Sequence, residues 1–364
     1  EAQKILERCK DQTGVIEENK KPAKQSPPQL FDLTTLQREA SSKFGFSARN
    51  TLAIAQSLYE RHKLLTYPRT DSKCLPEDYV DTIKSHVNDF ANSIANTSLH
   101  QQIIDSSSKV IENNWIKPNK RIFNDSKISD HFAIVPTGKI PTAGLKEQEQ
   151  KIYDLVTRRL VAIFYPSAEF ETTRRITRIN NDSFLTTGKI LVRPGFLEVY
   201  GRKPGVATEK NELIPAETGD KAKALSIEIK SEETKPPARY NEATLLGAME
   251  TAGKRIDDDE LKEAMKERGL GTPATRAAII EGLIAHKYLF RHEQQKRDLV
   301  VSNKGLALID LLNDIGIDAL SSPELTGEWE YKLKQMESGK LSREIFMEEI
   351  KTLTEEIVNR TSLK

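Results

Sequence analysis

Tyr67 and Arg69 are the residues in this sequence whose types and spacing most directly suggest chemistry. They lie two positions apart, and Pro68 between them marks a polar segment rather than a regular helix. A phenol is a weak nucleophile at neutral pH because its reference pKa is about 10. A nearby guanidinium favours the phenolate and grips a phosphate through two parallel hydrogen bonds. The pair therefore suits attack on a phosphodiester, although the same residues also suit an ordinary surface turn.

Two helices are expected to bring the chain to this segment. Thr35 suits the cap of the first, which is predicted to run through Ala40 and to end near Gly45. Ser47 suits the cap of the second, with Leu58 among its inward apolar residues. The second helix leads directly into the Tyr67 segment.

Three ordered blocks of sequence resemble the motifs of type IA DNA topoisomerases. Leu65 to Ser72, with Gln56 to Glu60 before it, is similar to the active-site signature of that family, and Pro68 resembles the bacterial topoisomerase III branch. His131 to Thr137 and Gly269 to Arg276 are similar to two further blocks. The resemblance covers nearly the whole chain, but the amino-terminal metal-binding (Toprim) domain of the family is not in this sequence.

The resemblance implies roles for residues within these blocks and around them. Tyr67 would be the nucleophile, Arg69 would hold the scissile phosphate, and His131 would hydrogen-bond that phosphate or the strand beside it. The residues that would bind DNA are Lys43, Thr70, Ser72, Arg239, Thr272, Thr275 and Arg276. For Lys43 an ordinary solvated helix face remains an open alternative.

His131 is chemically suited to its implied role, because histidine changes charge near neutral pH and so can donate to a phosphate oxygen. Taken alone, a single histidine is more often structural. The topoisomerase III branch often has a second histidine at the next position, whereas this chain has Phe132. This departure leaves open whether Phe132 alters catalysis.

The Gly269 to Arg276 block also has a chemistry of its own. Flexible glycines, hydroxyl groups and the free amides of a helix start form a cradle for a phosphate backbone, with Arg276 as the counter-charge. An ordinary capped turn is the alternative, and a Gly-x-Gly pattern by itself does not decide between the two.

Composition excludes several classes of protein. The chain has 364 residues, 37% of them hydrophobic and 30% charged, with a formal net charge of +1. No apolar run approaches the roughly 20 residues of a membrane span, so no membrane association is expected and the predicted location is cytoplasmic, with the nucleoid. Cys9 and Cys74 lie too far apart in sequence for a zinc-ribbon spacing. With so little net charge, DNA must be bound by local basic grooves.

We predict a multidomain α+β fold that forms the gate part of a toroidal topoisomerase. Residues 1–33 and 166–236 are assigned to a β arch, in which residues 1–10 could instead end a helix of the helical domain. Residues 34–165 form a mainly helical nucleophile domain, and residues 237–364 a mainly helical, winged-helix-like DNA-binding domain. Strands are expected at residues 13–19, 169–179, 183–187 and 224–229, whereas residues 20–28 read as a strand edge or connector and residues 96–119 give no clear pattern.

No metal site is expected in this chain. Asp257 to Glu260 is the only acidic run, and it reads as a solvated helix start, where negative charge offsets the helix dipole. The resemblance implies that Mg²⁺ is held by acidic residues that precede Glu1 in the full protein. We therefore expect this chain alone to be inactive in relaxing DNA.

The function implied by the resemblance is transient cleavage and religation of one DNA strand through a 5′-phosphotyrosine, with ATP-independent strand passage. The expected partners are single-stranded DNA and DNA, with a helicase as a further candidate and a monomer as the expected state. A non-catalytic single-strand-binding module, in which Tyr67 stacks on a base, is an alternative. A scaffold without affinity for nucleic acid is a second one.

Overall fold

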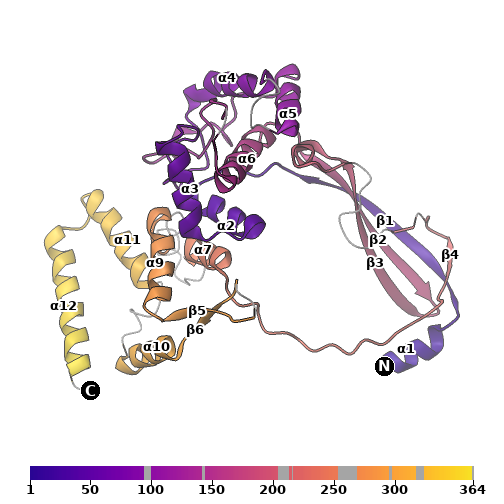
Figure 1. Ribbon diagram of the computed structural model, residues 1–364. Coiled ribbons are helices and arrows are strands. Elements are labelled where there is room, and N and C mark those ends of the chain that lie inside the picture. The colour runs from indigo at the N-terminus through magenta and orange to yellow at the C-terminus, as the bar shows by residue number, and fades with distance from the viewer. Residues whose placement is uncertain are drawn as a thin grey trace.

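The computed structural model describes residues 1–93, 100–141, 144–203, 213–214, 216–252, 269–294, 297–316 and 324–362. Figure 1 shows three parts: a cluster of helices α2 to α6, a long curved sheet, and a carboxy-terminal helical part that begins at α7. The acidic run Asp257 to Glu260 lies outside the described residues.

The helical cluster contains the main hydrophobic core. Its helices are α2 (Leu33–Phe44), α3 (Ala48–Glu60), α4 (Val80–Ala91), α5 (Gln101–Glu112) and α6 (Glu147–Ala162), with short 3₁₀ turns η1 (Glu77–Tyr79) and η2 (Asp125–Lys127). α6 lies in the middle of this cluster, because most of its residues are buried. α5 lies within residues 96–119, where no element was predicted.

The two helices before the Tyr67 segment form as expected, with one correction. Ser47 caps α3, since its hydroxyl accepts from the Asn50 amide at 3.1 Å. α2, however, is capped by Asp32 and not by Thr35. The Asp32 carboxylate accepts from the Thr35 amide at 2.7 Å, and the Thr35 hydroxyl accepts in return from the Asp32 amide at 3.2 Å. Thr35 is therefore the third residue of a capping box.

The sheet has four antiparallel strands in the order β3-β2-β1-β4: β1 (Thr13–Gln25), β2 (Ala168–Ile179), β3 (Asp182–Arg193) and β4 (Lys221–Lys223). β1 runs on through Pro22, which the sequence placed in a strand edge or connector. β4 pairs only with Thr13 to Val15, so β1 is an edge strand at Pro22, where a proline is tolerated.

The fourth strand was predicted in the wrong place. β4 comprises only Lys221–Lys223, the Ala224 amide adds one bond to Gln12 O at 2.9 Å, and residues 225–229 form no strand. Their alternating apolar residues mimic a strand, but Leu225 is 82% exposed and Ile229 is 47% exposed. The alternation therefore belongs to a solvated linker and not to a half-buried strand face.

The carboxy-terminal part has its own small core. It comprises α7 (Glu242–Glu250), α9 (Pro273–Ala285), the hairpin of β5 (Leu289–Arg291) and β6 (Leu299–Val301), α10 (Asn303–Ile315), α11 (Glu324–Glu337) and α12 (Arg343–Ser362). Leu246, Ala277, Ile280 and Leu299 pack together there. Ala48, from the start of α3, completes this cluster, so the two helical parts share a core.

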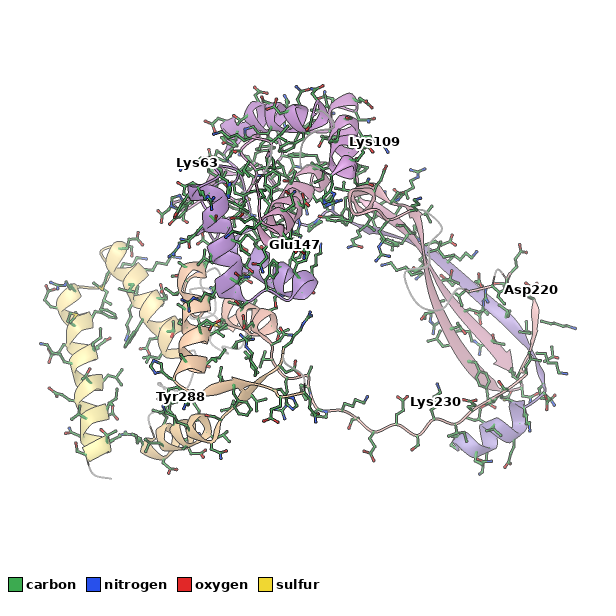
Figure 2. The ribbon with its side chains drawn as sticks, in the orientation of Figure 1. Lys63, Lys109, Glu147, Asp220, Lys230 and Tyr288 are labelled. Atoms are coloured by element: carbon green, nitrogen blue, oxygen red, sulfur yellow. The ribbon has the colours of Figure 1, made fainter. Side chains whose placement is uncertain are left out.

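The three parts follow one another around a ring (Figure 1). The sheet leaves the helical cluster where β2 follows α6, and the 3₁₀ turn η3 (Gly195–Tyr200) follows β3 at the same end of the sheet. α1 (Ala2–Cys9) lies at the far end of the sheet. α1 is held there by Arg8, which donates to Asp182 at 3.0 and 3.1 Å. The extended linker, with Lys230 in its middle in Figure 2, returns the chain to α7. Among the described residues, no helix is long and apolar enough to cross a membrane.

Candidate active site

The Tyr67 segment is fixed by backbone pairing with the segment that carries His131. The Thr66 amide donates to Val135 O at 2.9 Å, and the Thr137 amide donates to Leu64 O at 3.0 Å. The Thr66 hydroxyl adds a bond to Ala133 O at 2.9 Å. Two blocks that lie more than 60 residues apart in sequence are therefore joined into one rigid site.

The ring of Tyr67 lies between two other rings. The Tyr67 and His131 ring centroids are 4.3 Å apart at an interplanar angle of 49°. Tyr59, near the end of α3, packs edge-on against the Tyr67 ring, with a centroid distance of 5.4 Å and an interplanar angle of 78°. Tyr67 is half-buried and His131 is exposed, so the phenol is held in place while the site stays open to solvent.

Arg69 is exposed beside this group, and Gln56 is its neighbour on α3. With the Gln56 amide turned so that its oxygen faces the guanidinium, that oxygen accepts from Arg69 Nε at 3.3 Å and from Nη2 at 3.1 Å. The amide orientation is assigned from this hydrogen bonding. Gln56 leaves other donors of the Arg69 fork free to meet a bidentate acceptor such as a phosphate.

Thr70 and Ser72 face inward, although the resemblance implied contacts with DNA. Each is 3% exposed. The Thr70 hydroxyl donates to His131 O at 2.6 Å and accepts from the Ser72 amide at 3.0 Å. The Ser72 hydroxyl donates to Lys127 O at 2.9 Å. These hydroxyls hold the segment that bears His131 against the Tyr67 segment.

Lys43 and Arg239 lie away from the tyrosine. Lys43, in the last turn of α2, pairs with Glu39 at 2.7 Å and lies 5.2 Å from the centroid of the Tyr200 ring. Arg239 is exposed at the end of the linker, one residue before Tyr240, whose carbonyl accepts from the Leu299 amide at 2.7 Å. The structure therefore does not bring these two cations to Tyr67.

Thr272 and Thr275 form the capping box of α9. The Thr275 hydroxyl accepts from the Thr272 amide at 2.9 Å and lies 3.1 Å from the Thr272 hydroxyl. Both hydroxyls therefore take part in an ordinary capped turn, the alternative to a phosphate cradle. They lie at a helix start, where free amides attract anions.

Arg276 is 3% exposed and joins the two helical parts. It donates through Nε to Leu270 O at 3.1 Å and through Nη1 to the Thr34 hydroxyl, on α2, at 3.0 Å. Burial lowers the pKa of Arg276, against the opposing effect of Glu250, Asp32 and Asp71. The guanidinium is therefore a tie between α9 and α2 rather than an exposed counter-charge.

Sequence reasoning missed an ionic group at this same junction. Lys73 Nζ lies 3.2 Å from the Asp32 carboxylate and 3.4 Å from that of Glu250, on α7. Burial raises the pKa of Asp32, and Lys73 opposes this rise. Burial lowers the pKa of Lys73 but is outweighed by the two carboxylates, so that pKa is raised. Of the three residues in this group, only Asp32 carries a sequence signal, because Asp32 and Thr35 have the spacing of a capping box.

Glu242 makes a second contact across the junction. Its carboxylate accepts from the Ala48 amide, at the start of α3, at 2.9 Å and pairs with Arg291 of β5. A carboxylate at a helix start satisfies a free amide and offsets the dipole. One residue of α7 therefore caps the helix that leads to Tyr67.

In the described parts of the chain, no three side chains of His, Cys, Asp or Glu converge as metal ligands. The residues around Tyr67 do not fit a magnesium site, since Tyr67, Arg69 and His131 include no carboxylate.

The comparisons with known proteins place the chain in a family. A family model described as DNA topoisomerase matches residues 1–348. The chain thus belongs to the type IA DNA topoisomerase family, the class to which its fold and its sequence motifs point.

Within that class the chain is most readily compared with bacterial DNA topoisomerase 3. It is 41% identical over 359 residues to DNA topoisomerase 3 of Bacillus cereus, covering 96% of this chain and 47% of that protein. It is 37% identical over 364 residues to DNA topoisomerase 3 of Bacillus subtilis, covering 98% and 48%. The chain therefore spans about half the length of the curated relatives that it matches.

A solved structure shares the fold. Full-length topoisomerase I from Thermotoga maritima matches with a TM-score of 0.70 and 24% sequence identity, covering 99% of this chain and 55% of that chain. At this identity the likeness supports the mixed α/β architecture alone.

Proposed function

We propose that this chain is the strand-gating half of a topoisomerase III-like enzyme, with Tyr67 as its nucleophile. The observation that carries the proposal is the junction of two distant sequence blocks, which places the Tyr67 ring against His131 with Arg69 exposed beside them. The family and the Bacillus relatives support the class of reaction. DNA, with one strand as the cleaved substrate, is the proposed partner.

The proposed reaction is a transesterification. The phenolic oxygen of Tyr67 attacks the phosphorus of one DNA strand, an O–P bond forms to the 5′ end, and the bond from phosphorus to the 3′ oxygen breaks. The phenol loses its proton and the 3′ oxygen gains one, so the balance of atoms is kept. Because one phosphoester bond replaces another, the 3′ hydroxyl can reverse the step without ATP.

Arg69 and His131 have separate proposed roles. Arg69 would grip and neutralise the non-bridging oxygens of the scissile phosphate as charge develops on them. His131 would donate a hydrogen bond to that phosphate or to the strand beside it. The hydrogen bonds to Gln56 position the Arg69 guanidinium and leave other donors of its fork for the phosphate.

We further propose that this chain alone does not relax DNA. In the family, magnesium would be held by acidic residues of the amino-terminal domain and would help to neutralise the phosphate. The residues of this chain would bind the strand and supply the nucleophile. If the isolated chain relaxed negatively supercoiled plasmid, this part of the proposal would be wrong.

A direct test uses a 3′-labelled single-stranded oligonucleotide with magnesium and a separately made amino-terminal domain of a topoisomerase 3 relative. On a denaturing gel, label at protein size that needs both pieces and disappears in Tyr67→Phe supports the proposal. No adduct under any condition, with the strand still bound, would favour the non-catalytic binding module instead.

A further inference from the structure

The turn that joins α3 to the Tyr67 segment contains a residue in an unusual backbone conformation. Lys63 has a φ of 56°, in the left-handed region, where a residue other than Gly, Asn or Asp is uncommon. The turn closes through a bond from the Leu64 amide to Leu58 O at 2.8 Å. Glycine is the usual residue at such a helix end, because it has no Cβ to strain. Lys63 is therefore less favourable here than a glycine would be, and strain of this kind gathers at functional sites.

Hydrogen bonds hold the backbone of this turn. The Lys63 carbonyl accepts from the Thr137 hydroxyl at 2.7 Å, and Leu64 O accepts from the Thr137 amide at 3.0 Å. Thr137 is the last residue of the block that carries His131. The strained turn is therefore fastened to the segment that forms the other side of the candidate site.

The ammonium group of Lys63 lies over the ring of Tyr59, one helical turn earlier in the chain. Its Nζ is 5.6 Å from the centroid of that ring, within the range of a cation–π contact. Lys63 is exposed, and Figure 2 shows it at the edge of the helical cluster. The side chain of the strained residue thus contacts a ring that itself packs against Tyr67.

The orientation of the Tyr67 ring matters for the proposed reaction. A phosphoryl group is transferred with the attacking and leaving oxygens roughly in line, so the phenolic oxygen must approach from one direction. Tyr59 is half-buried on α3 and meets the Tyr67 ring edge-on, while His131 lies on another segment. A chain of contacts leads from the Lys63 ammonium through the Tyr59 ring to the nucleophile.

We propose that Tyr59 is a positioning residue for the Tyr67 ring and that the Lys63 ammonium holds Tyr59 in place. The inference rests on the proposed function, since it is the nucleophile whose ring must be held in one orientation. A direct contact between Lys63 and a phosphate of the bound strand is the alternative, and the test below separates the two.

The first measurement is the rate of adduct formation on the 3′-labelled oligonucleotide, in a single turnover with the separately made amino-terminal domain. Tyr59→Leu should slow it about tenfold, because an aromatic pair is lost. Lys63→Gln should slow it about threefold, because the cation–π contact is lost. Tyr59→Phe and Lys63→Arg keep the ring and the cation, so they should keep the original rate. An unchanged rate in Tyr59→Leu and Lys63→Gln would overturn the proposal.

Stability distinguishes positioning from a merely structural role. Lys63→Gly relieves the left-handed strain, so its urea midpoint should rise although its adduct forms more slowly. Lys287, with a φ of 62° just after α9, is the matched control, because it is also exposed. Lys287→Gly should raise the midpoint and leave the rate unchanged. A fall in both the midpoint and the rate of Lys63→Gly would make Lys63 a structural residue only.

Binding of a labelled oligothymidine, followed by fluorescence anisotropy at several salt concentrations, tests the alternative contact. Tyr59→Leu, Lys63→Gln and the control Lys287→Gln should all bind like the original chain, with the same salt dependence. If Lys63→Gln alone reduced the log–log salt slope by about 0.7, the value for one phosphate contact on a single strand, Lys63 would be a DNA contact and the proposal would be wrong.

A last arm does not depend on the reaction. The nuclear magnetic resonance signal of the His131 imidazole, assigned by its loss in His131→Gln, senses the Tyr67 ring because the two centroids are 4.3 Å apart. Tyr59→Leu and Lys63→Gln should shift this signal, whereas Lys287→Gln should not. These shifts without any adduct from the original chain would contradict only the proposed function. A signal that stays in place in Tyr59→Leu would overturn the positioning role, whether or not an adduct forms.

Discussion

At the scale of single residues, neighbours in the Tyr67 segment have opposite tasks. The side chain of Arg69 is exposed next to the phenol, whereas that of the following residue, Thr70, is 3% exposed and bonded to His131 O. A motif of consecutive residues therefore contains both groups that can touch a substrate and groups that hold the motif together.

Thr70→Val and Arg69→Ala separate these tasks. Thr70→Val keeps the shape but leaves His131 O and the Ser72 amide without a partner, so we expect it to lower the unfolding free energy by about 1–3 kcal/mol. Arg69→Ala removes an exposed side chain and is expected to change it by less than about 0.5 kcal/mol while abolishing adduct formation. Urea denaturation measures both, and equal stability losses would contradict this division.

His86 gives a prediction about pH. It lies beneath the segment that follows the His131 block, where a side chain at Gly138 would come within 2.5 Å of the imidazole. Burial lowers the pKa of His86, against opposing effects of Asp89 and the Pro136 carbonyl. The folded chain therefore binds this proton less readily than the unfolded chain, whose histidine titrates near about pH 6.5.

Stability should consequently fall as the pH drops through about 6.5, because the unfolded state takes up the proton first. His86→Gln should make the urea midpoint less dependent on pH between about pH 5 and 7. If the original chain and this variant show the same pH dependence, His86 is not the group responsible.

At the scale of elements, the sequence predicted those helices, caps and strands whose signals are local. Ser47 as a cap, the helix through Ala40 and the strand at residues 169–179 could be anticipated, because caps and apolar spacing are local signals. The partner with which a strand pairs could not be predicted from local signals. Leu225 and Ile229 belong to an alternating apolar pattern that is typical of a strand. They would form a strand only by pairing with β1, and that pairing ends with β4, before Leu225.

The candidate site divides in the same way. Tyr67, Arg69 and His131 were identified from sequence blocks, and the structure brings Tyr67 and His131 into contact. Whether Thr70, Ser72 and Arg276 point outward or inward depends on tertiary partners that no pattern reports. Lys73 and Glu242 carry no motif at all, because their importance comes from elements that meet only in the folded chain.

The cap of α3 by Glu242 leads to a prediction at this scale. Glu242→Gln should weaken both the bond to the Ala48 amide and the pair with Arg291, and we expect a loss of about 1–2 kcal/mol in the unfolding free energy. Glu112→Gln, at an exposed helix end, is the matched control and should change little. A thermal or urea melt in which the two variants behave alike would contradict the cap.

At the scale of the whole molecule, the ring is closed at one polar junction. Lys73, Glu242 and Arg276 make ionic or hydrogen-bonded contacts between α2–α3 and α7–α9, and Ala48 provides a small apolar contact. Polar interfaces of this kind open more readily than large hydrophobic ones. When this junction opens, the long sheet and the extended linker would keep the two helical parts connected (Figure 1).

We therefore expect Lys73→Met combined with Glu242→Gln to populate wider shapes without unfolding the chain. Small-angle X-ray scattering should show a larger radius of gyration for this double variant than for Glu112→Gln, with helix content unchanged by circular dichroism. An unchanged radius in a folded double variant would show that these contacts do not hold the ring closed.

The identity of the nucleophile is the central claim, and peptide mapping of the covalent adduct tests it most directly. Tyr59 is the informative rival because its ring packs against that of Tyr67, yet trypsin separates the two by cleaving after Arg61 and Lys63. Mass spectrometry of nuclease-trimmed adduct should find the nucleotide on the peptide from Leu64 to Arg69, attached to Tyr67. A nucleotide on the peptide that contains Tyr59, or an adduct that persists in Tyr67→Phe, would contradict the assignment.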